Sequence, residues 1–437
     1  MASGSSGRSR ARKLQTLRGV GVARSRMKSS SVPQTTTSWA KSGAGSSGDA
    51  ARATRTRARR TVMRQKIAVC TTVGRCARSD RDARERSSRA TVRASPVSDI
   101  HARVACYMTL ILSQQDVREC LPMDACMRVM RDTLIALSVG DAVQPLRSVM
   151  RGPEHKGVLG VMPGWLPGLG VMGLKAVSVF SGNHAAGLES HIGAVLLHET
   201  KHGQLIAIAD ASEITAIRTA AVSGVATQAL ARDNASDLAI LGAGTQARTH
   251  LEAMLLARTL RRVRVWSRTR AHADAFAAWA AQRFAVAVEV MPSVRDAVHE
   301  ADIICTTTAS REPILEGAWV APGAHINAVG SSVAFARELD TAAVVASRLF
   351  VDRQESTINE AGDYLFPLRE GAITEAHIVG ELGDVLRGVR PGRGSPTEIT
   401  LFKSLGIAIE DIAAAQYVYT QAQATGRGVT VHLGGTR

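Results

Sequence analysis

Aromatic residues are scarce in this sequence of 437 residues: they make up 4% of it, whereas hydrophobic residues of all kinds make up 45%. A chain with this hydrophobic content can bury a core, and its length suits two or three domains, so wholesale disorder is excluded. No stretch approaches the ~18 uninterrupted apolar residues that a membrane-spanning helix needs, and the first residues lack the apolar run of a secretory signal. These absences predict a soluble protein without a membrane partner.

Cysteine is also sparse, and its six residues form no C-x-x-C pair: Cys70, Cys76, Cys106, Cys120, Cys126 and Cys305. Six thiols spread over a chain of this length indicate neither a disulfide scaffold nor a zinc ribbon. The pattern fits a reducing compartment, and we expect a cytoplasmic protein.

Acidic residues are almost absent from the first quarter of the chain, which accounts for the formal net charge of +16. Residues 1–107 contain 24 Lys and Arg but only 5 Asp and Glu, whereas residues 108–437 contain 30 basic and 33 acidic residues. The first segment is rich in Ser, Arg, Thr and Ala and has no sustained apolar period, so burial could not offset its ordering entropy. We therefore predict a disordered basic tail over residues 1–107.

Three interpretations of this tail stay open. A translation start placed too far upstream is the plainest, because regular structure is predicted only after Met108. An organellar transit peptide would also be rich in Arg and Ser, although such peptides are usually shorter, and it would make the protein organellar. A basic arm that neutralises nucleic-acid phosphates is the third. Because the positive charge is confined to the tail, we do not expect nucleic acid to be the partner.

Regular structure is predicted from Ser113 onward. Residues 113–116 have the composition of a helix start with an acid in the first turn. A second predicted helix, 122–138, spaces its apolar residues by three or four, namely Met123, Met127, Met130 and Leu134. Short apolar runs between polar turns then predict a meandering sheet over 157–162, 174–180, 192–198 and 205–210, followed by a helix over 216–232.

At Asp237 the pattern changes to strand, glycine turn and helix. Residues 238–241 read as a short buried strand, residues 242–247 match G-x-G-x-x-A, and residues 248–259 read as a helix. Further apolar runs alternate with helical segments up to residue 329, which predicts a parallel α/β sheet. The glycines allow a tight turn and the close approach of a pyrophosphate, which helix N-terminal N–H groups then bind. The predicted cofactor contacts here are Gly242, Gly244, Thr245, Gln246 and Ala247.

Two other motif matches lack the context that their chemistry needs. Residues 168–173 also fit G-x-G-x-x-G, but they follow prolines and lead into a β-like run, so we predict no phosphate loop there. Residues 198–202 match H-E-x-x-H, which binds zinc only when a helix brings both histidines to one face. Strand-like runs flank this motif and Gly203 follows it, which predicts a hairpin turn and no metal site.

The end of the second strand of the α/β unit bears on which dinucleotide is bound. An acid there would accept hydrogen bonds from the adenosine ribose 2′-OH and repel a 2′-phosphate. This chain instead has Ser267, Arg268 and Thr269, whose hydroxyls can donate to a phosphate and whose guanidinium supplies compensating charge. NADP(H) is therefore favoured over NAD(H), and a solvated basic turn is the alternative.

Seven segments, taken in order, resemble the ornithine cyclodeaminase/mu-crystallin family: 143–149, 155–163, 173–175, 217–222, 242–247, 325–330 and 401–406. The likeness runs from about Met108 to about Ala424. It implies an α/β fold in which a Rossmann NAD(P)-binding domain, 231–352, is inserted into an α+β substrate-binding and dimerisation domain, 108–230 and 353–437. It also implies a homodimer that acts on a small imino or amino acid.

The resemblance implies roles for individual residues. Arg147, Lys175 and Arg218 match the family's cationic residues around the substrate carboxylate and the nicotinamide. A guanidinium can hold a carboxylate in a bidentate grip, and a second cation fixes its orientation. Cofactor contacts beyond the glycine loop and the basic turn are expected at Arg218, Thr219, Thr307, Val329 and Leu405.

The informative departure from part of the family lies after Gly330. Ornithine cyclodeaminases carry an aspartate two residues later, where it handles protons, whereas this chain has Ser332, as the mu-crystallin-like ketimine reductases do. A serine hydroxyl can relay a proton but is a poor base without an activating partner. We therefore expect an oxidoreductase in which NAD(P)H reduces a cyclic ketimine or 2-imino carboxylate to the amino acid, with Ser332 and Lys175 as catalytic residues.

Two alternatives to this function stay open. An ornithine cyclodeaminase would convert L-ornithine to L-proline and ammonia. A protein that only binds NADP(H) or another ligand would carry out no chemistry, and the intact Arg147, Lys175 and Arg218 argue against it.

Overall fold

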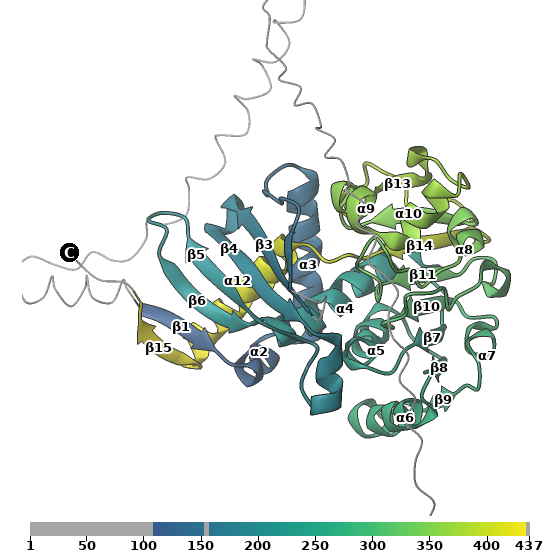
Figure 1. Cartoon of the computed structure of the whole chain (residues 1–437), viewed down its shortest axis with the longest axis horizontal. Coiled ribbons are helices and arrows are strands. Elements are labelled where there is room, and N and C mark those ends of the chain that lie inside the picture. Colours follow the sequence, from purple (N-terminus) through teal and green to yellow (C-terminus); the bar gives the residue numbers. More distant parts are fainter. Residues whose placement is uncertain (1–107, 153–156, 434–437) are drawn as a thin grey trace, which may run out of the picture. The chain divides into compact units, whose positions relative to one another are not determined.

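The computed structural model describes residues 108–152 and 157–433, which form two sheets with helices packed on them (Figure 1). The predicted disordered tail, residues 1–107, lies outside these described residues. Among the helices that are described, none combines the length and the apolar character that crossing a bilayer requires.

The first strand, β1 (Met108–Leu112), leads into two helices whose starts follow from local chemistry. Ser113 caps α2 (Gln114–Cys120): its hydroxyl accepts a hydrogen bond from Asp116 N at 3.2 Å, and Asp116 Oδ2 accepts one from Ser113 N at 2.9 Å. This reciprocal pair satisfies two helix-terminal N–H groups, as the sequence predicts. The next helix, α3 (Met123–Ser138), buries the apolar residues whose spacing predicted it.

The first sheet is the predicted meander, with strand order β15-β1-β6-β5-β4-β3-β2. Its strands pair antiparallel except β1 and β6, which run parallel. β15 comes from the end of the described chain and pairs with β1, so the first and last segments meet in one sheet. The remaining elements of this sheet are β2 (Ser148–Arg151), β3 (Val158–Leu166), η3 (Pro167–Leu169), β4 (Val171–Val179), η4 (Ser181–Ala186), β5 (His191–Glu199), β6 (Leu205–Asp210) and β15 (Val429–His432).

The two motif matches that lack the required context lie where one strand turns into the next. Residues 168–173 connect β3 to β4 and enter β4 directly. His198 and Glu199 end β5, and the Glu199 carboxylate accepts hydrogen bonds from the backbone N–H groups of the turn, namely those of Lys201, His202 and Gln204. Glu199 therefore stabilises a hairpin turn. Within the described ranges, no group of three or more His, Cys, Asp or Glu side chains is arranged to hold a metal ion.

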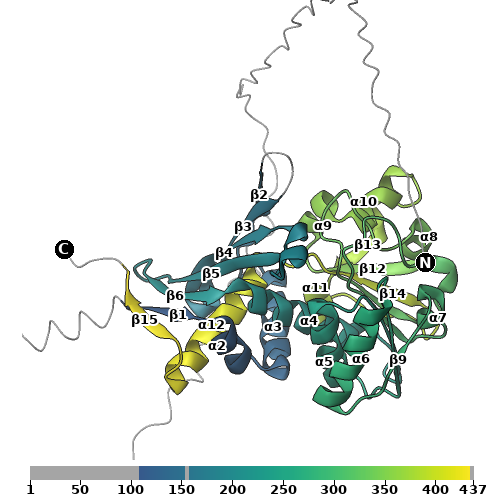
Figure 2. The same cartoon turned by 60° about the horizontal axis from the view of Figure 1, so that its bottom comes forward.

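The long helix α4 (Ala211–Leu230) lies between the two sheets and is buried along most of its length. It packs against α3, α5 (Thr245–Ala257) and α12 (Ala408–Thr425) (Figure 2), and it also contacts β11 (His325–Ala328) and β14 (Ile399–Lys403). The helix begins five residues before the predicted Ala216, because Asp210, the last residue of β6, also caps it by accepting a hydrogen bond from Glu213 N at 2.8 Å. Apart from Glu213, Arg218 and Gln228, its residues are apolar or small, as suits a helix buried between layers.

The second sheet is the predicted parallel α/β sheet, with strand order β13-β12-β14-β11-β10-β7-β8-β9. Its strands are β7 (Asp237–Leu241), β8 (Arg262–Trp266), β9 (Val288–Val290), β10 (Ile303–Thr306), β11 (His325–Ala328), β12 (Ser347–Val351), β13 (Ile378–Glu381) and β14 (Ile399–Lys403). Its helices are α5 (Thr245–Ala257), α6 (Arg270–Phe284), α7 (Val294–Val298), η5 (Gly317–Trp319), α8 (Thr341–Val345), α9 (Gln354–Glu360), α10 (Gly362–Arg369), η6 (Glu375–His377) and α11 (Leu382–Leu386).

This sheet continues beyond residue 352, where the chain was expected to leave the Rossmann domain. β14 inserts between β11 and β12, and β13 pairs with the outer edge of β12. The chain does not return to the first sheet before α12 (Ala408–Thr425), which packs on β3, β4 and β5. The expected class, a Rossmann unit inserted into an α+β unit, is confirmed, and residues 353–404 complete the inserted sheet.

Candidate active site

Most of the predicted cofactor residues lie at the carboxyl ends of the parallel strands, whereas Arg218 and Thr219 lie on α4. Residues 242–247 follow β7, residues 267–269 follow β8, Thr307 follows β10, Val329 follows β11 and Leu405 follows β14. These five strands are consecutive in the sheet order β14-β11-β10-β7-β8, so the loops share one edge. In open α/β sheets this edge is where ligands bind.

The glycine loop has the shape that a pyrophosphate needs. Gly242 has φ +117°, and a Cβ at this position would lie 2.7 Å from Thr307 O, so only glycine fits against the neighbouring loop. Gly244 is the N-cap of α5, whose first turn has no side-chain cap. A Cβ at Gly244 would meet no atom within 4 Å. The helix N–H groups thus open onto space where a phosphate can approach, and the loop fits a dinucleotide.

One of the two arginines in the basic turn after β8 has no ion-pair partner among the described residues. Arg268 is exposed and Ser267 is half-buried. Arg270 is paired with Asp274, at 2.9 Å between Nε and Oδ1, whereas Arg268 makes no ion pair with any described residue. The Arg268 guanidinium is therefore free to neutralise a phosphate at this strand end.

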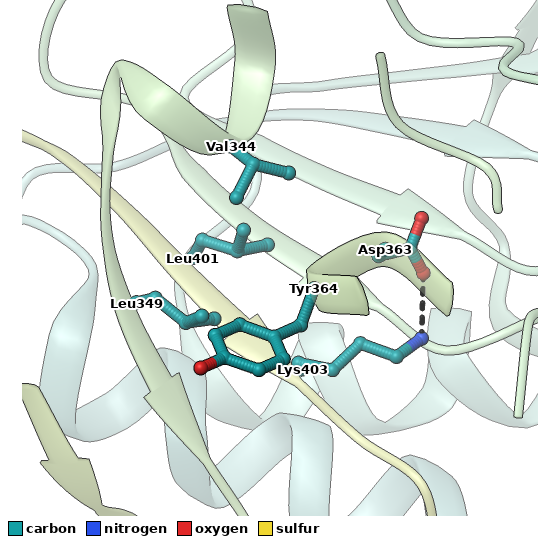
Figure 3. Close-up of a pocket in the computed structure, with 6 residues that line it drawn as sticks. All are labelled: Val344, Leu349, Asp363, Tyr364, Leu401 and Lys403. Atoms are coloured by element: carbon teal, nitrogen blue, oxygen red, sulfur yellow. Dashed lines mark ion pairs between the residues drawn. The ribbon is translucent and has the colours of Figure 1, made fainter. Parts of the chain in front are cut away.

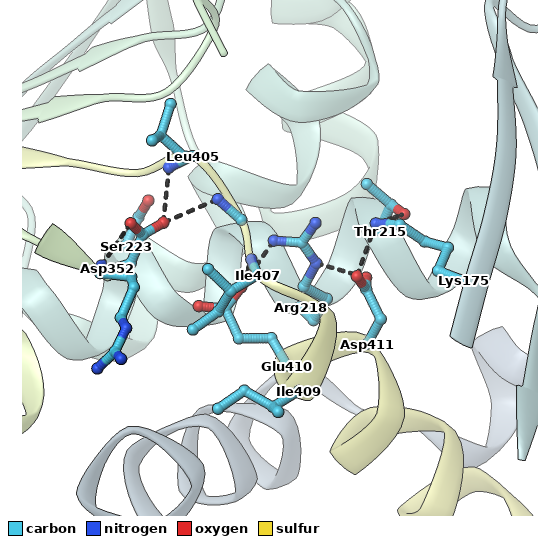
Figure 4. A network of polar contacts seen from close by, with 12 residues as sticks. Lys175, Thr215, Arg218, Ser223, Asp352, Leu405, Ile407, Ile409, Glu410 and Asp411 are labelled. Carbon is cyan, nitrogen blue, oxygen red and sulfur yellow. Dashed lines mark hydrogen bonds and ion pairs between the residues drawn. The ribbon is translucent and has the colours of Figure 1, made fainter. Parts of the chain in front are cut away.

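Lys175 and Arg218 share one buried carboxylate. Lys175 lies on β4 and Arg218 on α4, and each is only 3% exposed. Asp411, on α12, has its Oδ2 2.7 Å from Lys175 Nζ and accepts at Oδ1 a hydrogen bond from Arg218 Nε at 2.8 Å (Figure 4). Arg218 Nη1 also donates to Glu410 Oε2 at 2.8 Å. Two of the predicted site residues are thus joined by side chains from the last helix.

Burial and close charges shift the pKa values in this cluster. Burial lowers the pKa of Lys175 to about 8, although the adjacent Asp411 opposes the shift. Burial would raise the pKa of Asp411, but the Arg218 and Lys175 charges outweigh burial and lower it. Burial also raises the pKa of Glu410 to about 8 against the opposing effect of Arg218. Lys175 can therefore exchange a proton near neutral pH, which suits acid–base chemistry.

Arg147 approaches the same cluster from the first domain but has other partners. Its Nε lies 2.8 Å from Glu360 Oε2, and its Nη2 donates to the carbonyl oxygens of Leu405 at 3.3 Å and Gly406 at 3.2 Å. Gly406 has φ +72°, and a Cβ there would collide with the Arg218 guanidinium. The 405–406 backbone therefore lies against both Arg147 and Arg218.

The other predicted site residues have plainer surroundings. Thr219, Val329 and Leu405 are buried, and Gln246 Nε2 donates to Thr215 O at 3.4 Å. Ser332 lies in the loop after β11, half-buried, and its side chain makes no hydrogen bond with any described residue. In the described ranges, no hydrogen bond or ion pair joins it to Lys175, Arg147 or Arg218.

Four acidic residues at this site were not singled out from the sequence: Asp352, Glu360, Glu410 and Asp411. Asp352 Oδ2 accepts hydrogen bonds from Leu405 N at 2.6 Å and Gly406 N at 2.8 Å, which holds the backbone beside Arg218. Glu410 and Asp411 open an otherwise largely apolar helix. Adjacent acids at such a position were the available signal for buried partners of the predicted cations.

Comparison with known proteins agrees with this architecture. The sequence model of the ornithine cyclodeaminase/mu-crystallin family matches residues 107–426. Ketimine reductase mu-crystallin of Mus musculus is 42% identical over 280 residues, which cover 64% of this chain and 85% of that protein. The solved structure of Thermococcus litoralis Δ1-pyrroline-2-carboxylate reductase in complex with NADH and L-proline has a TM-score of 0.73 and 37% identity, and covers 74% of this chain and 100% of that one.

An archaeal alanine dehydrogenase dimer with bound NAD has a TM-score of 0.70 and 31% identity, and covers 74% of this chain and 100% of that chain. These matches extend over both sheets and confirm the relationship that the seven segments predicted. The chain belongs to the ornithine cyclodeaminase/mu-crystallin family.

Proposed function

We infer that this chain is a nicotinamide-dependent oxidoreductase that reduces a C=N bond next to a carboxylate, with a cyclic ketimine as substrate. Relatives that are ketimine and Δ1-pyrroline-2-carboxylate reductases support this reaction. The structural observation that carries it is a group of three cations: Arg147 and Arg218 lie against the 405–406 backbone, and Lys175 shares Asp411 with Arg218. This backbone follows β14 at the edge where the dinucleotide loops lie.

The cofactor would be held by the 242–247 loop and the 267–269 turn. When bound, NAD(P)H supplies the hydride that the reaction requires. We propose that NADP(H) is preferred, because Arg268 is exposed and makes no ion pair with a described residue, and no acid occupies residues 267–270 to repel a 2′-phosphate. Gly244 leaves room for the pyrophosphate at the start of α5.

The substrate carboxylate would bind beside Arg147 and Lys175. The Arg147 hydrogen bonds to the carbonyls of Leu405 and Gly406 are long, at 3.3 and 3.2 Å, so a carboxylate is a stronger acceptor for the same guanidinium. Arg218 already donates to both Glu410 and Asp411. We therefore assign Arg147 and Lys175 to the carboxylate and give Arg218 the task of orienting the cluster.

Reduction of an imine also needs one proton at nitrogen. Lys175, with its pKa lowered by burial to about 8, is largely protonated at neutral pH and can release this proton readily. Ser332 would relay a proton directly or through water, since its hydroxyl has no competing partner among the described residues. Both residues were predicted as catalytic, and we retain that assignment as a proposal.

We propose that the active protein is a homodimer, which the archaeal alanine dehydrogenase dimer supports.

The test of the function is a turnover assay of the purified chain with Δ1-pyrroline-2-carboxylate and a panel of larger cyclic ketimines. Loss of reduced-nicotinamide absorbance with at least one of these substrates, and none with the ring-reduced amino acid, is expected. Binding of NADPH without turnover of any imine would favour a ligand-binding protein instead.

A further inference from the structure

A second buried carboxylate lies at the same edge of the sheet, and its side chain makes no hydrogen bond with any of the described residues assigned above. Glu338 is fully buried. Its Oε1 accepts hydrogen bonds from Thr308 N and Thr308 Oγ1, and its Oε2 accepts from Thr306 Oγ1 and Gly330 N, all four at 2.7 Å. Thr306 is the last residue of β10, and the other donors lie in the loops that follow β10 and the neighbouring strand β11. One side chain therefore ties the two loops together.

The two loops approach so closely that only glycine fits between them. A Cβ at Gly330 would lie 2.6 Å from Glu338 Oε1 and would collide with Thr308 O. The residues between and beside these contacts are Thr307, Val329 and Ser332, all of them predicted site residues. The position of Glu338 thus determines the relative position of the segments that carry them.

A buried lysine continues this network from below the loops. Lys403, on β14, has its Nζ 2.9 Å from Asp363 Oδ2, and each side chain is 1% exposed (Figure 3). Lys403 Nζ also donates to Ala328 O at 3.2 Å and to Ser331 O. Asp363 Oδ1 in turn accepts from Glu338 N at 2.8 Å. The same cluster therefore holds both the backbone of Glu338 and the loop that carries Ser332.

Burying the charged groups of Glu338, Asp363 and Lys403 costs desolvation free energy, and apolar side chains could fill this space without that cost. Burial and the nearby Asp363 charge raise the pKa of Glu338, in accord with such a cost. Each Glu338 oxygen nevertheless accepts two hydrogen bonds, and their donors lie at the end of β10 and in the loops after β10 and β11. The hydrogen bonds thus define the shape of loops that lie on the opposite side of β7 from the turn after β8.

We propose that Glu338 is a positioning residue for the nicotinamide half of the cofactor site: its carboxylate fixes the loops after β10 and β11 so that Thr307, Val329 and Ser332 face the nicotinamide ring. This inference rests on the proposed function in one respect, namely that the ligand is a nicotinamide dinucleotide. Among the described residues, no hydrogen bond or ion pair joins Glu338 to the glycine loop or to Arg268, which would hold the other half.

The test compares two ligands that differ only in the nicotinamide half. Glu338→Gln keeps the size of the side chain, but an amide nitrogen cannot accept, so some of the four hydrogen bonds are lost in either orientation of the amide. Titration calorimetry on the purified chain is expected to show weaker NADPH binding by about tenfold or more, as for the loss of buried hydrogen bonds. Binding of 2′-phospho-ADP-ribose, which lacks the nicotinamide, should change by less than about twofold.

Ser347→Ala is the matched control, because it removes one buried hydrogen bond, from Ser347 Oγ to Ala343 O at 2.6 Å, in the same domain and away from the loops. It should leave both affinities unchanged. Thr306→Val is a milder second variant that removes a single donor to Glu338 and should weaken only NADPH binding. It provides the same comparison if Glu338→Gln does not fold.

If Glu338→Gln weakened the binding of both ligands equally, or did not weaken NADPH binding, the positioning role would be overturned. Because these are binding measurements, they separate this inference from the reductase assignment. If the parent chain reduces no imine but Glu338→Gln weakens the binding of NADPH alone, the reductase assignment is contradicted and the positioning role is supported. A parent chain that binds neither ligand would overturn both.

Discussion

Lys175 Nζ and Asp411 Oδ2 lie 2.7 Å apart, in a part of the structure where both side chains are buried. The second oxygen of Asp411 accepts from Arg218 Nε, so one carboxylate compensates two buried cations. The three residues come from β4, α4 and α12, and α12 is the helix by which the chain returns from the inserted sheet. The charge balance of the site therefore depends on the inserted topology.

Asp411→Asn keeps the shape of the side chain and removes its charge. We expect it to lower the free energy of unfolding by ~3–5 kcal/mol, which is typical when one partner of a buried pair is lost. Asp124→Asn is the control, because the Asp124–Arg128 pair is exposed and should contribute only ~0–1 kcal/mol. Urea denaturation measures both, and similar losses in the two variants would argue against compensation by Asp411.

The pKa of Lys175 predicts the alkaline limb of the pH profile. Since burial lowers this pKa to about 8, the protonated form predominates below that pH and is lost as the pH rises through it. Turnover of the imine should therefore decline above about pH 8. Lys175→Arg should shift this decline to higher pH, because a guanidinium stays protonated throughout, even though the turnover itself falls.

Glu410 needs its own control because burial raises its pKa into the same range. Glu410→Gln should retain a decline in turnover above about pH 8. If the decline disappeared in Glu410→Gln and persisted in Lys175→Arg, Glu410 would be the titrating group and the assignment of Lys175 would be incorrect.

Cofactor preference should depend on Arg268. Arg268→Asp removes a cation and adds a repulsive anion where the 2′-phosphate is expected, so it should weaken NADPH binding by ~1–3 kcal/mol and reverse the preference for NADPH over NADH. Arg295→Asp makes the same charge change on α7 and should leave the preference intact. Fluorescence titration with both cofactors measures the ratio, and equal affinities in the parent chain would contradict the proposal.

Ser332→Ala should slow ketimine reduction by roughly tenfold to a hundredfold if the hydroxyl relays the proton, at the low end of general acid catalysis. Ser332→Thr keeps a hydroxyl and should retain more of the rate than Ser332→Ala. Single-turnover kinetics with saturating cofactor separate this step from cofactor binding. An unchanged rate in Ser332→Ala would remove Ser332 from the mechanism without affecting the reductase assignment.

Much of the fold could be predicted because its determinants are local. The Ser113 cap and the 242–247 loop are defined by residues within one helical turn, so the sequence shows them directly. The same local reasoning identified the hairpin at 198–203, since strand-like runs flank it. It placed the start of α4 too late because Asp210 serves at once as a strand end and as a helix cap.

The acidic half of the site could not be predicted in this way. Arg218 and Asp411 are 193 residues apart, and Thr306 and Glu338 are 32 apart, so no periodicity within an element joins them. The continuation of the second sheet past residue 352 could not be predicted for the same reason, because β12 pairs with β14 and β13 through contacts between residues far apart in the sequence. Glu360 likewise gave no sign that it pairs with Arg147.

The most direct test of the central claim compares two reactions in the unmodified chain. One sample receives Δ1-pyrroline-2-carboxylate with NADPH, the other L-ornithine with NAD(P)⁺, and both nicotinamide absorbance and ammonia are followed. We predict consumption of NADPH with formation of proline in the first sample and little or no ammonia in the second. Brisk formation of proline and ammonia from ornithine, without reduction of the ketimine, would contradict it and assign the chain to the cyclodeaminases.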